Sequence, residues 1–179
     1  MQRIAFISEH ASPLALLGGA DGGGQNVYVG KLARELGRLG YLVDIYTRRD
    51  DREVPQVVDW YAGVRVIHVD AGPPTALPKE ALLPYMSQFT EGVLSFLREH
   101  MLGYALVHAH FFMSGMVAQR LKQTLGLPFV MTFHALGRVR RQYQGEADGF
   151  PDARFALEEA LMREADCVIA ECEQDKRDM

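Results

Sequence analysis

A glycine-rich segment near the amino terminus is the first part of the chain whose residue types suggest chemistry. Residues 18–26 read GGADGGGQN, so five of the seventeen glycines fall within nine positions. Glycine has no Cβ atom and lets a ligand approach the main chain closely. Where such a loop leads into a helix, free N–H groups and the helix dipole favour a phosphate or another anionic oxygen. The segment therefore predicts an anion-binding loop; the alternative is a flexible loop that only needs positive φ values.

Two common phosphate-binding motifs do not fit this segment. A dinucleotide fingerprint GxGxxG read from Gly22 has Val27 where the third glycine belongs. A Walker A motif needs a glycine five positions before the pair at residues 30–31 and a hydroxyl residue after it, but Gln25 and Leu32 occupy those places. Both motifs are therefore disfavoured.

Histidines fall at the ends of several predicted strands. His10 follows the first strand, His108 and His110 end the fourth, and His134 follows the fifth. Because the carboxyl ends of parallel strands meet at one edge of a sheet, these side chains and the glycine loop predict a shared polar pocket. His108 and His110 could hold a metal together with His134, but the local sequence offers no well-placed carboxylate, so we predict no metal site.

A basic group follows His134 within one or two turns. It consists of Arg138, Arg140 and Arg141. Guanidinium groups suit a phosphate dianion, since their donors form a planar fork. A solvated charged loop explains the same residues equally well, and the sequence leaves both interpretations open.

The elements that position these residues follow from hydrophobic periodicity. Strand-length apolar runs alternate with helix-period stretches along nearly the whole chain, which predicts an α/β fold with a doubly wound, mostly parallel sheet and helices on both faces. The predicted strands are Arg3–Ser8, Leu42–Tyr46, Val64–Val69, Ala105–His108, Phe129–Thr132 and Cys167–Ala170.

The connections between these strands are predicted from their turn and breaker residues. Asp59–Gly63 is expected to be a tight turn that adds an antiparallel element at one edge of the sheet. Residues 71–78, AGPPTALP, contain three prolines and predict an extended connection. A helix is expected over Glu80–Glu99.

Composition limits the class of protein. With 179 residues and 48% apolar content, the chain is expected to form one domain over residues 1–179. A net charge of −4 and a pI near 5.9 make nucleic acid an unexpected partner. The apolar run at the amino terminus is too short for a signal peptide or membrane span, so a cytoplasmic protein is predicted. Cys167 and Cys172 predict no disulfide framework.

The last residues suggest that more chain is needed. The segment ECEQDKRDM leaves a predicted strand and has the composition of a first helical turn. An α/β sheet rarely finishes on an incomplete helix, so the expectation is that this chain is the front part of a longer protein.

Residues 7–50 strongly resemble the opening of retaining glycosyltransferases of family GT4, a family that includes sucrose-phosphate synthases, sucrose synthases and the mycothiol-pathway transferases. The segments VHAHFFMSG and TFHALGRVRRQ resemble further GT4 segments, so the similarity covers nearly the whole chain. The resemblance implies the N-terminal half of a GT-B fold, that is, a Rossmann-like domain that binds the acceptor. The nucleotide-sugar domain would be absent from this chain, which alone would be inactive.

The resemblance also implies roles for individual residues. Gly18 and Gly19 would lie near the donor diphosphate, and His110 would contact the donor sugar at the reacting centre, so that His110 and Gly19 would be catalytic. Acceptor contacts would come from the second half of the glycine loop and from the later basic segments, with Glu158 in a supporting role. The implied acceptor-binding residues are Gly23, Gly24, Gln25, His134, Arg138, Arg140 and Arg154.

The implied function is transfer of a hexose from a nucleotide sugar, expected to be UDP-linked, to a sugar or sugar-phosphate acceptor. The nucleotide sugar would be a co-substrate, and no other cofactor is expected. A stand-alone sugar-phosphate binding module is one alternative. A more remote one is an NADP-linked reductase, in which Arg48 and Arg49 would meet the 2′-phosphate.

Overall fold

One twisted sheet organises the chain. The computed structural model describes residues 1–15 and 23–179, and the strands among them pair in the order β3-β4-β2-β1-β5-β6-β7. Every neighbouring pair is parallel except β3 with β4. The strands are β1 (Arg3–Ile7), β2 (Leu42–Arg48), β3 (Val57–Tyr61), β4 (Val64–Val69), β5 (Leu106–His110), β6 (Phe129–Thr132) and β7 (Cys167–Val168).

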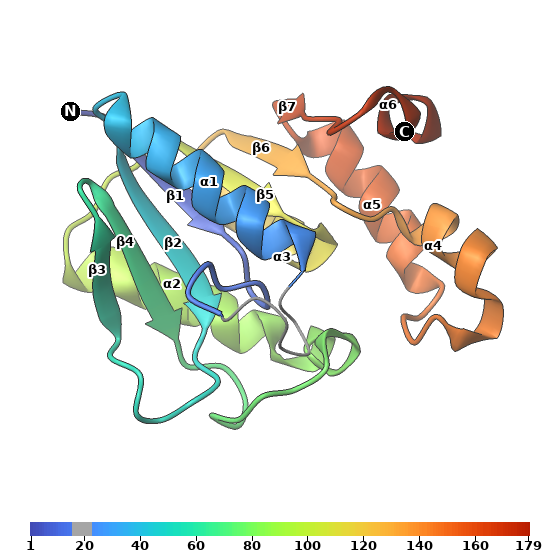
Figure 1. Cartoon of the computed structure of the whole chain (residues 1–179), viewed down its shortest axis with the longest axis horizontal. Coiled ribbons are helices and arrows are strands. Elements are labelled where there is room, and N and C mark those ends of the chain that lie inside the picture. The colour runs from blue at the N-terminus through green and yellow to red at the C-terminus, as the bar shows by residue number, and fades with distance from the viewer. Residues whose placement is uncertain (16–22) are drawn as a thin grey trace.

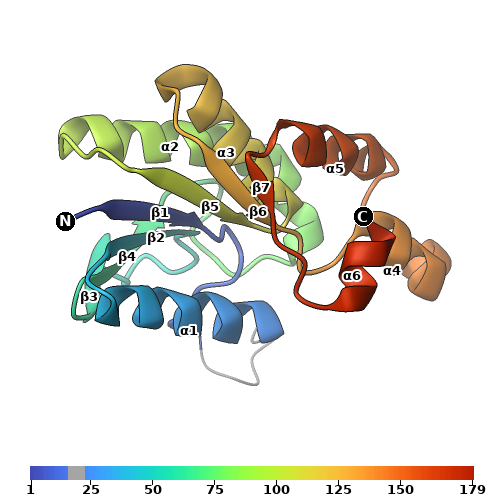
Figure 2. The same cartoon turned by 90° about the horizontal axis from the view of Figure 1, so that it is seen from above.

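Helices cover both faces of this sheet, as predicted. In Figure 2, helix α1 lies on one face, and α2, α3 and α5 lie on the other. The shorter helices α4 and α6 lie toward one end of the molecule (Figure 1). The helices are α1 (Gly24–Arg38), α2 (Met86–Glu99), α3 (Phe112–Leu125), α4 (Gly137–Gln144), α5 (Ala153–Glu164) and α6 (Glu173–Asp178), with short 3₁₀ turns at Lys79–Ala81, Leu83–Tyr85 and Gly145–Ala147.

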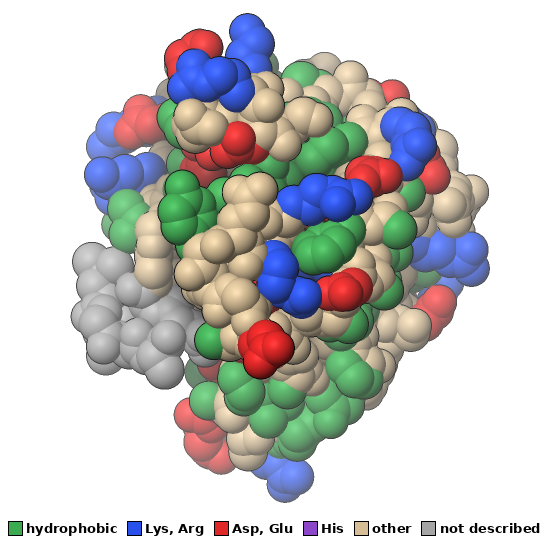
Figure 3. Space-filling model, turned by 90° about the vertical axis from the view of Figure 1, so that its right-hand side faces the viewer, with side chains coloured by type: hydrophobic (Ala, Val, Ile, Leu, Met, Phe, Trp, Pro, Cys, Tyr) green, Lys and Arg blue, Asp and Glu red, His purple; other side chains and the backbone are tan. Residues whose placement is uncertain are grey.

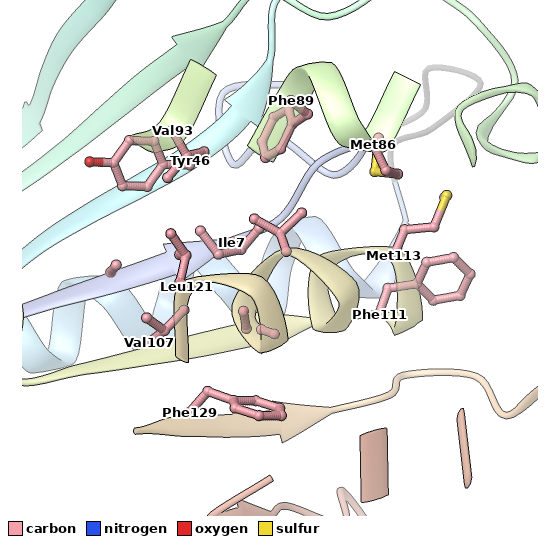
Figure 4. Close-up of a cluster of buried hydrophobic side chains, with 14 of the residues drawn as sticks. Ile7, Tyr46, Met86, Phe89, Val93, Val107, Phe111, Met113, Leu121 and Phe129 are labelled. Carbon is pink, nitrogen blue, oxygen red and sulfur yellow. The ribbon is translucent and has the colours of Figure 1, made fainter. Parts of the chain in front are cut away.

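Alternation along the central strand separates two hydrophobic cores. Ile4 and Phe6 of β1 pack with the residues beneath α1, whereas Ala5 and Ile7 belong to the larger core beneath α2 and α3. Figure 4 shows part of the larger core, where side chains of α2 and α3 meet the sheet. Burial of each large apolar side chain there contributes about 1.5–3 kcal/mol.

The predicted strands agree with the structure in type and order, and Val64–Val69 and Phe129–Thr132 agree in both bounds. One prediction was wrong: Asp59–Gly63 is not all turn, because residues 59–61 continue strand β3. Trp60 and Tyr61 favour extended backbone, so the strand runs on until the turn at Ala62 and Gly63, where Gly63 has φ +77°.

The connection after β4 is extended, as its prolines predict, and a buried side chain holds it. Arg48 Nη1 donates to the carbonyl of Pro73 at 2.8 Å, and Arg48 Nη2 donates to that of Thr75 at 2.6 Å. The helix predicted from Glu80 begins only at Met86, because Pro84 limits the preceding residues to 3₁₀ turns. Arg48 therefore binds the main chain of this connection, and its neighbour Arg49 lies 3.5 Å from Asp70, so both arginines of the reductase alternative already face groups of the protein.

Candidate active site

The strand order reverses at β1, which pairs with β2 on one side and β5 on the other. In open α/β sheets, ligands bind outside the carboxyl ends of the strands at such a reversal. Here that edge carries Ser8, Glu9 and His10 after β1, and His110 at the end of β5. We call this edge, together with His134 after β6 and the amino end of α1, the rim. Of the predicted histidines, His110 and His134 therefore meet beside the start of α1, whereas His10 lies against Glu9 and lines another cavity.

Two imidazoles of the rim are joined directly. His110 Nδ1 lies 3.1 Å from His134 Nε2, and the two rings stack with centroids 5.3 Å apart. On its other side, His134 Nδ1 lies 3.0 Å from Glu171 Oε2. His108 points elsewhere with its ring nitrogen, 2.9 Å from Thr132 Oγ1. The pair His110–His134 is thus linked to a carboxylate, and His108 stands apart from that link.

Burial keeps these imidazoles neutral at physiological pH. It lowers the pKa of His108 to about 3 and that of His134 to about 4, and holds the pKa of His110 well below its usual range. In the described residues, no group of three or more histidine, cysteine or acidic side chains is arranged to hold a metal ion. The rim therefore offers neutral hydrogen-bonding rings.

The backbone at the rim is held in an uncommon conformation. His134 has φ +59° and Phe111 has φ +81°, values that side-chain-bearing residues rarely adopt. Tyr28 of α1 packs its ring against His134, with centroids 5.1 Å apart. Such strain persists only where surrounding contacts enforce it, and it is common at functional sites.

A second polar cluster lies directly after β1. Glu9 is fully buried; its carboxylate accepts a hydrogen bond from Ser114 Oγ and lies 2.7 Å from His10 Nδ1. Gln25 Nε2 donates to Ser8 Oγ at 3.2 Å and to the His110 carbonyl at 3.3 Å. These bonds tie the start of α1 to the ends of β1 and β5. The sequence analysis did not single out Ser8, Glu9 or Ser114. For Ser8 and Glu9, the polar run at residues 8–10 directly after a buried strand is a usable signal.

The glycines of the predicted loop divide between described and undescribed residues. Gly18 and Gly19, predicted at the donor diphosphate, lie outside the described residues. Gly23 and Gly24 are exposed, and a Cβ atom added at either would meet no heavy atom of the described residues within 4 Å. The described residues therefore leave the main chain at the amino end of the 15-residue helix α1 uncovered at these two positions.

The predicted arginines are paired with carboxylates. Arg138 Nη2 lies 2.6 Å from Glu159 Oε1 on the surface. Arg140 reaches Glu80 at 2.8 Å and Asp148 at 3.0 Å. Viewed from the right-hand side of Figure 1, basic and acidic side chains are interspersed, with no single basic patch (Figure 3). These arginines therefore act within ion-pair networks.

Arg154 differs from the other arginines because it is buried. Its Nε lies 2.7 Å from Glu158 Oε1, its Nη2 donates to the carbonyl of Ala135, and its guanidinium packs against the rings of Phe111 and Phe112. Its Nη1 is buried with no hydrogen-bond partner in the described part of the chain. Glu158 also accepts a hydrogen bond from the Gly137 N–H at 2.8 Å. The Arg154–Glu158 pair therefore binds the main chain of the loop between β6 and α4.

A cavity of about 220 Å³ adjoins the rim. His134, Arg140 and Glu171 lie in its lining, whereas His110 is fully buried and is not part of the lining. The cavity thus brings together the predicted His134 and Arg140 with Glu171, which the sequence analysis missed.

Among the described residues, no helix combines the length and the apolar character needed to span a bilayer.

Known proteins are similar to this chain in sequence and in fold. The family model described as "Glycosyl transferase 4-like domain" matches residues 23–179. The structure of sucrose-phosphate synthase from Thermosynechococcus elongatus superposes with a TM-score of 0.92 at 34% identity, covering 99% of this chain and 44% of that chain.

Two curated relatives are D-inositol 3-phosphate glycosyltransferases. That of Corynebacterium urealyticum is 40% identical over 178 residues, covering 99% of this chain and 42% of the relative. That of Kineococcus radiotolerans is 38% identical over 181 residues, covering 100% of this chain and 42% of the relative. The chain thus spans less than half the length of these relatives.

Proposed function

The chain belongs to the glycosyl transferase 4-like family and folds as the N-terminal half of a GT-B glycosyltransferase, and from this premise we propose that it is the acceptor-binding part of a retaining hexosyltransferase. The reaction would transfer a hexose from a nucleotide sugar to a sugar-phosphate or related polyol-phosphate acceptor. The observation that carries the proposal is the rim, where the start of α1 and the His110–His134 pair meet beside the reversal of strand order, and where His134 and Arg140 line one cavity.

A phosphorylated acceptor is favoured by the names of the relatives and by the arginines. The relatives act, by name, on inositol 3-phosphate or belong to sucrose-phosphate synthesis. We propose that Arg140, on the cavity lining, contacts the acceptor phosphate, and that Arg154 supports the loop beneath it. Gly23, Gly24, Gln25, His134 and Arg138 would complete the acceptor side.

The chemical step suits neutral imidazoles. A retaining transfer passes through an oxocarbenium-like state, while negative charge grows on the leaving diphosphate. Uncharged His110 and His134 add no positive charge beside that cationic sugar. Glycine amides and the helix dipole at the start of α1 would stabilise the diphosphate, with Gly18 and Gly19 as the nearest main chain. The nucleotide sugar is the co-substrate, with no further cofactor in the proposal.

The test is a transfer assay on the protein encoded by the complete reading frame that contains these residues. Nucleotide hexoses are offered with inositol 3-phosphate, fructose 6-phosphate and the two unphosphorylated compounds. We expect transfer to a phosphorylated acceptor. We also expect Arg140→Lys to raise the KM for that acceptor about 10- to 100-fold, the equivalent of one charge-assisted hydrogen bond.

The matched control for this assay is Arg163→Lys. Arg163 is exposed and pairs with Glu159, so its substitution should leave the acceptor KM unchanged. Transfer that ignores the phosphate, or equal KM values in the two variants, would refute the assignment of Arg140. Absence of transfer with every pair of substrates would refute the proposed acceptor class.

A further inference from the structure

Three side chains form a hydrogen-bonded chain that runs inward from the cavity. Glu171 Oε2 is 3.0 Å from His134 Nδ1, and His134 Nε2 is 3.1 Å from His110 Nδ1. Glu171 and His134 line the cavity, and His110 is fully buried behind them. The remaining ring nitrogen, His110 Nε2, is buried and has no hydrogen-bond partner in residues 1–15 and 23–179. A buried polar atom of this kind requires an explanation.

The hydrogen bonds determine where the protons lie. An ionised Glu171 can only accept, so His134 Nδ1 carries a proton and His134 Nε2 is bare. That bare nitrogen accepts from His110 Nδ1, which leaves a lone pair on His110 Nε2. If Glu171 instead carried a proton and donated it, both bonds would reverse and His110 Nε2 would become a donor.

The surroundings keep both imidazole rings neutral. Only neutral rings give the hydrogen bonds from Glu171 through His134 to His110 a defined donor and acceptor order. Burial lowers the pKa of His134 to about 4 and outweighs the nearby carboxylates. Burial and Asp175 raise the pKa of Glu171. Protonation of Glu171, which would reverse the donors and acceptors in both hydrogen bonds, is thereby brought closer to neutral pH. The other titratable groups that face the three side chains are Glu9 and His10 after β1, Tyr28 of α1 and His108 of β5.

We propose that Glu171 is a positioning residue that acts through His134 to leave His110 Nε2 as a hydrogen-bond acceptor at the rim. The consequence for transfer rests on the proposed function, whereas the proton positions do not. A lone pair accepts a hydrogen bond from a sugar hydroxyl and repels a phosphate oxygen. The contact with the donor sugar that the family resemblance implies for His110 would therefore need this lone pair.

Nitrogen-15 NMR of the imidazoles in this chain tests the proton positions without any assay of activity. The six histidines are assigned by single substitutions. At neutral pH we expect His110 and His134 to be neutral with the proton on Nδ1, and Nε2 to give the signal of an unprotonated nitrogen. A proton on Nε2 of either ring would overturn the proposal.

The variant Glu171→Gln removes the carboxylate charge and keeps nearly the same side-chain shape. A glutamine amide can donate as well as accept, so we expect both rings to shift toward the Nε2-protonated form. Glu173→Gln is the matched control, because it removes the same charge from an exposed residue on α6 and should change neither ring. Unchanged proton positions in Glu171→Gln would overturn the proposal.

The catalytic consequence is measured in the complete protein. Glu171→Gln should lower kcat about 10- to 100-fold, the rate equivalent of one charge-assisted hydrogen bond, with the acceptor KM unchanged. Glu173→Gln should retain full kcat. Normal kcat in Glu171→Gln would overturn the role of Glu171 in transfer. The expected NMR result without transfer from any donor would instead refute the proposed function and leave the proton positions established.

Discussion

At the residue scale, the rim is built from groups whose charge is either suppressed or matched. His110 and His134 are buried as neutral rings, and the arginines around the cavity face carboxylates. The sequence predicted the histidines because each ends or follows an apolar strand. It did not predict Glu171, because that residue is 37 positions from His134 and only the β6–β7 pairing brings the two together.

Buried neutral histidines make stability depend on pH. The pKa of His134 is about 4 when folded and near 6.5 when unfolded, so the unfolded chain binds more protons between these values. Stability is therefore expected to fall as the pH drops from about 6.5 toward 4, by at most about 1.4 kcal/mol per pH unit for each such histidine. Urea unfolding at several pH values measures this slope.

His134→Asn identifies the residue responsible, since asparagine tolerates the left-handed backbone at this position. The slope should be shallower in His134→Asn than in the parent protein. His100 is exposed, so His100→Asn should keep the parent slope. Equal slopes in the two variants would contradict the assignment.

Asp44 provides a second prediction at this scale. It is buried in β2 and accepts from Arg3 Nη1, Arg65 Nε and Tyr104 OH, each at 2.8 Å. Burial alone would raise its pKa, but the bonds from Arg65 and Tyr104 outweigh burial and hold the pKa below its usual value. Replacing one carboxylate oxygen by an amide NH2 removes the charge and leaves the donors on that side without an acceptor.

We expect Asp44→Asn to lower the free energy of unfolding by about 3 kcal/mol. Asp59→Asn is the control, because Asp59 is exposed on β3 and its substitution should cost less than about 0.5 kcal/mol. Denaturant titration of both variants provides the comparison. A cost for Asp44→Asn as small as that of the control would show that the arginines find other partners.

At the element scale, helix α1 connects the core to the site. Its buried residues Val29 and Ala33 pack on the sheet, and Gln25 in its first turn bonds to the ends of β1 and β5. Val29, Leu32, Ala33 and Leu36 recur at helical spacing, which is typical of an amphipathic helix, and Gly40, which has φ +89°, follows its end. Leu39 fits the same periodicity but is 74% exposed, because the helix ends at Arg38, one residue earlier.

The carboxyl end of α1 requires a close approach to the sheet. A Cβ atom at Gly37 would lie 2.8 Å from the carbonyl oxygen of Ala62 in the β3–β4 turn, whereas one at Gly24 would meet no described residue within 4 Å. We expect Gly37→Ala to destabilise the fold by about 1–3 kcal/mol. Gly24→Ala should change stability by less than about 0.5 kcal/mol. Thermal unfolding of the two variants distinguishes them, and equal midpoints would mean that the turn moves freely away from α1.

At the scale of the whole molecule, most of the architecture could be predicted from the sequence. Strands β4 and β6 were predicted with both bounds: Gly63 and Asp70 flank β4, and Pro128 precedes β6, which ends at the polar residue Thr132. The shared edge followed from topology alone, since all carboxyl ends of a parallel sheet point the same way. The ion pairs of Arg140 could not be predicted, because Glu80 and Asp148 come from separate connections that only folding brings to α4.

The central claim is that a phosphorylated acceptor binds at the rim, and amide chemical-shift mapping of this chain tests it most directly. On titration with inositol 3-phosphate, we predict that the largest shifts fall at residues 23–25 and 134–140, and that unphosphorylated inositol gives much smaller ones. Shifts of equal size with both compounds, or shifts centred on the exposed face of α1 near Trp60, would contradict the account.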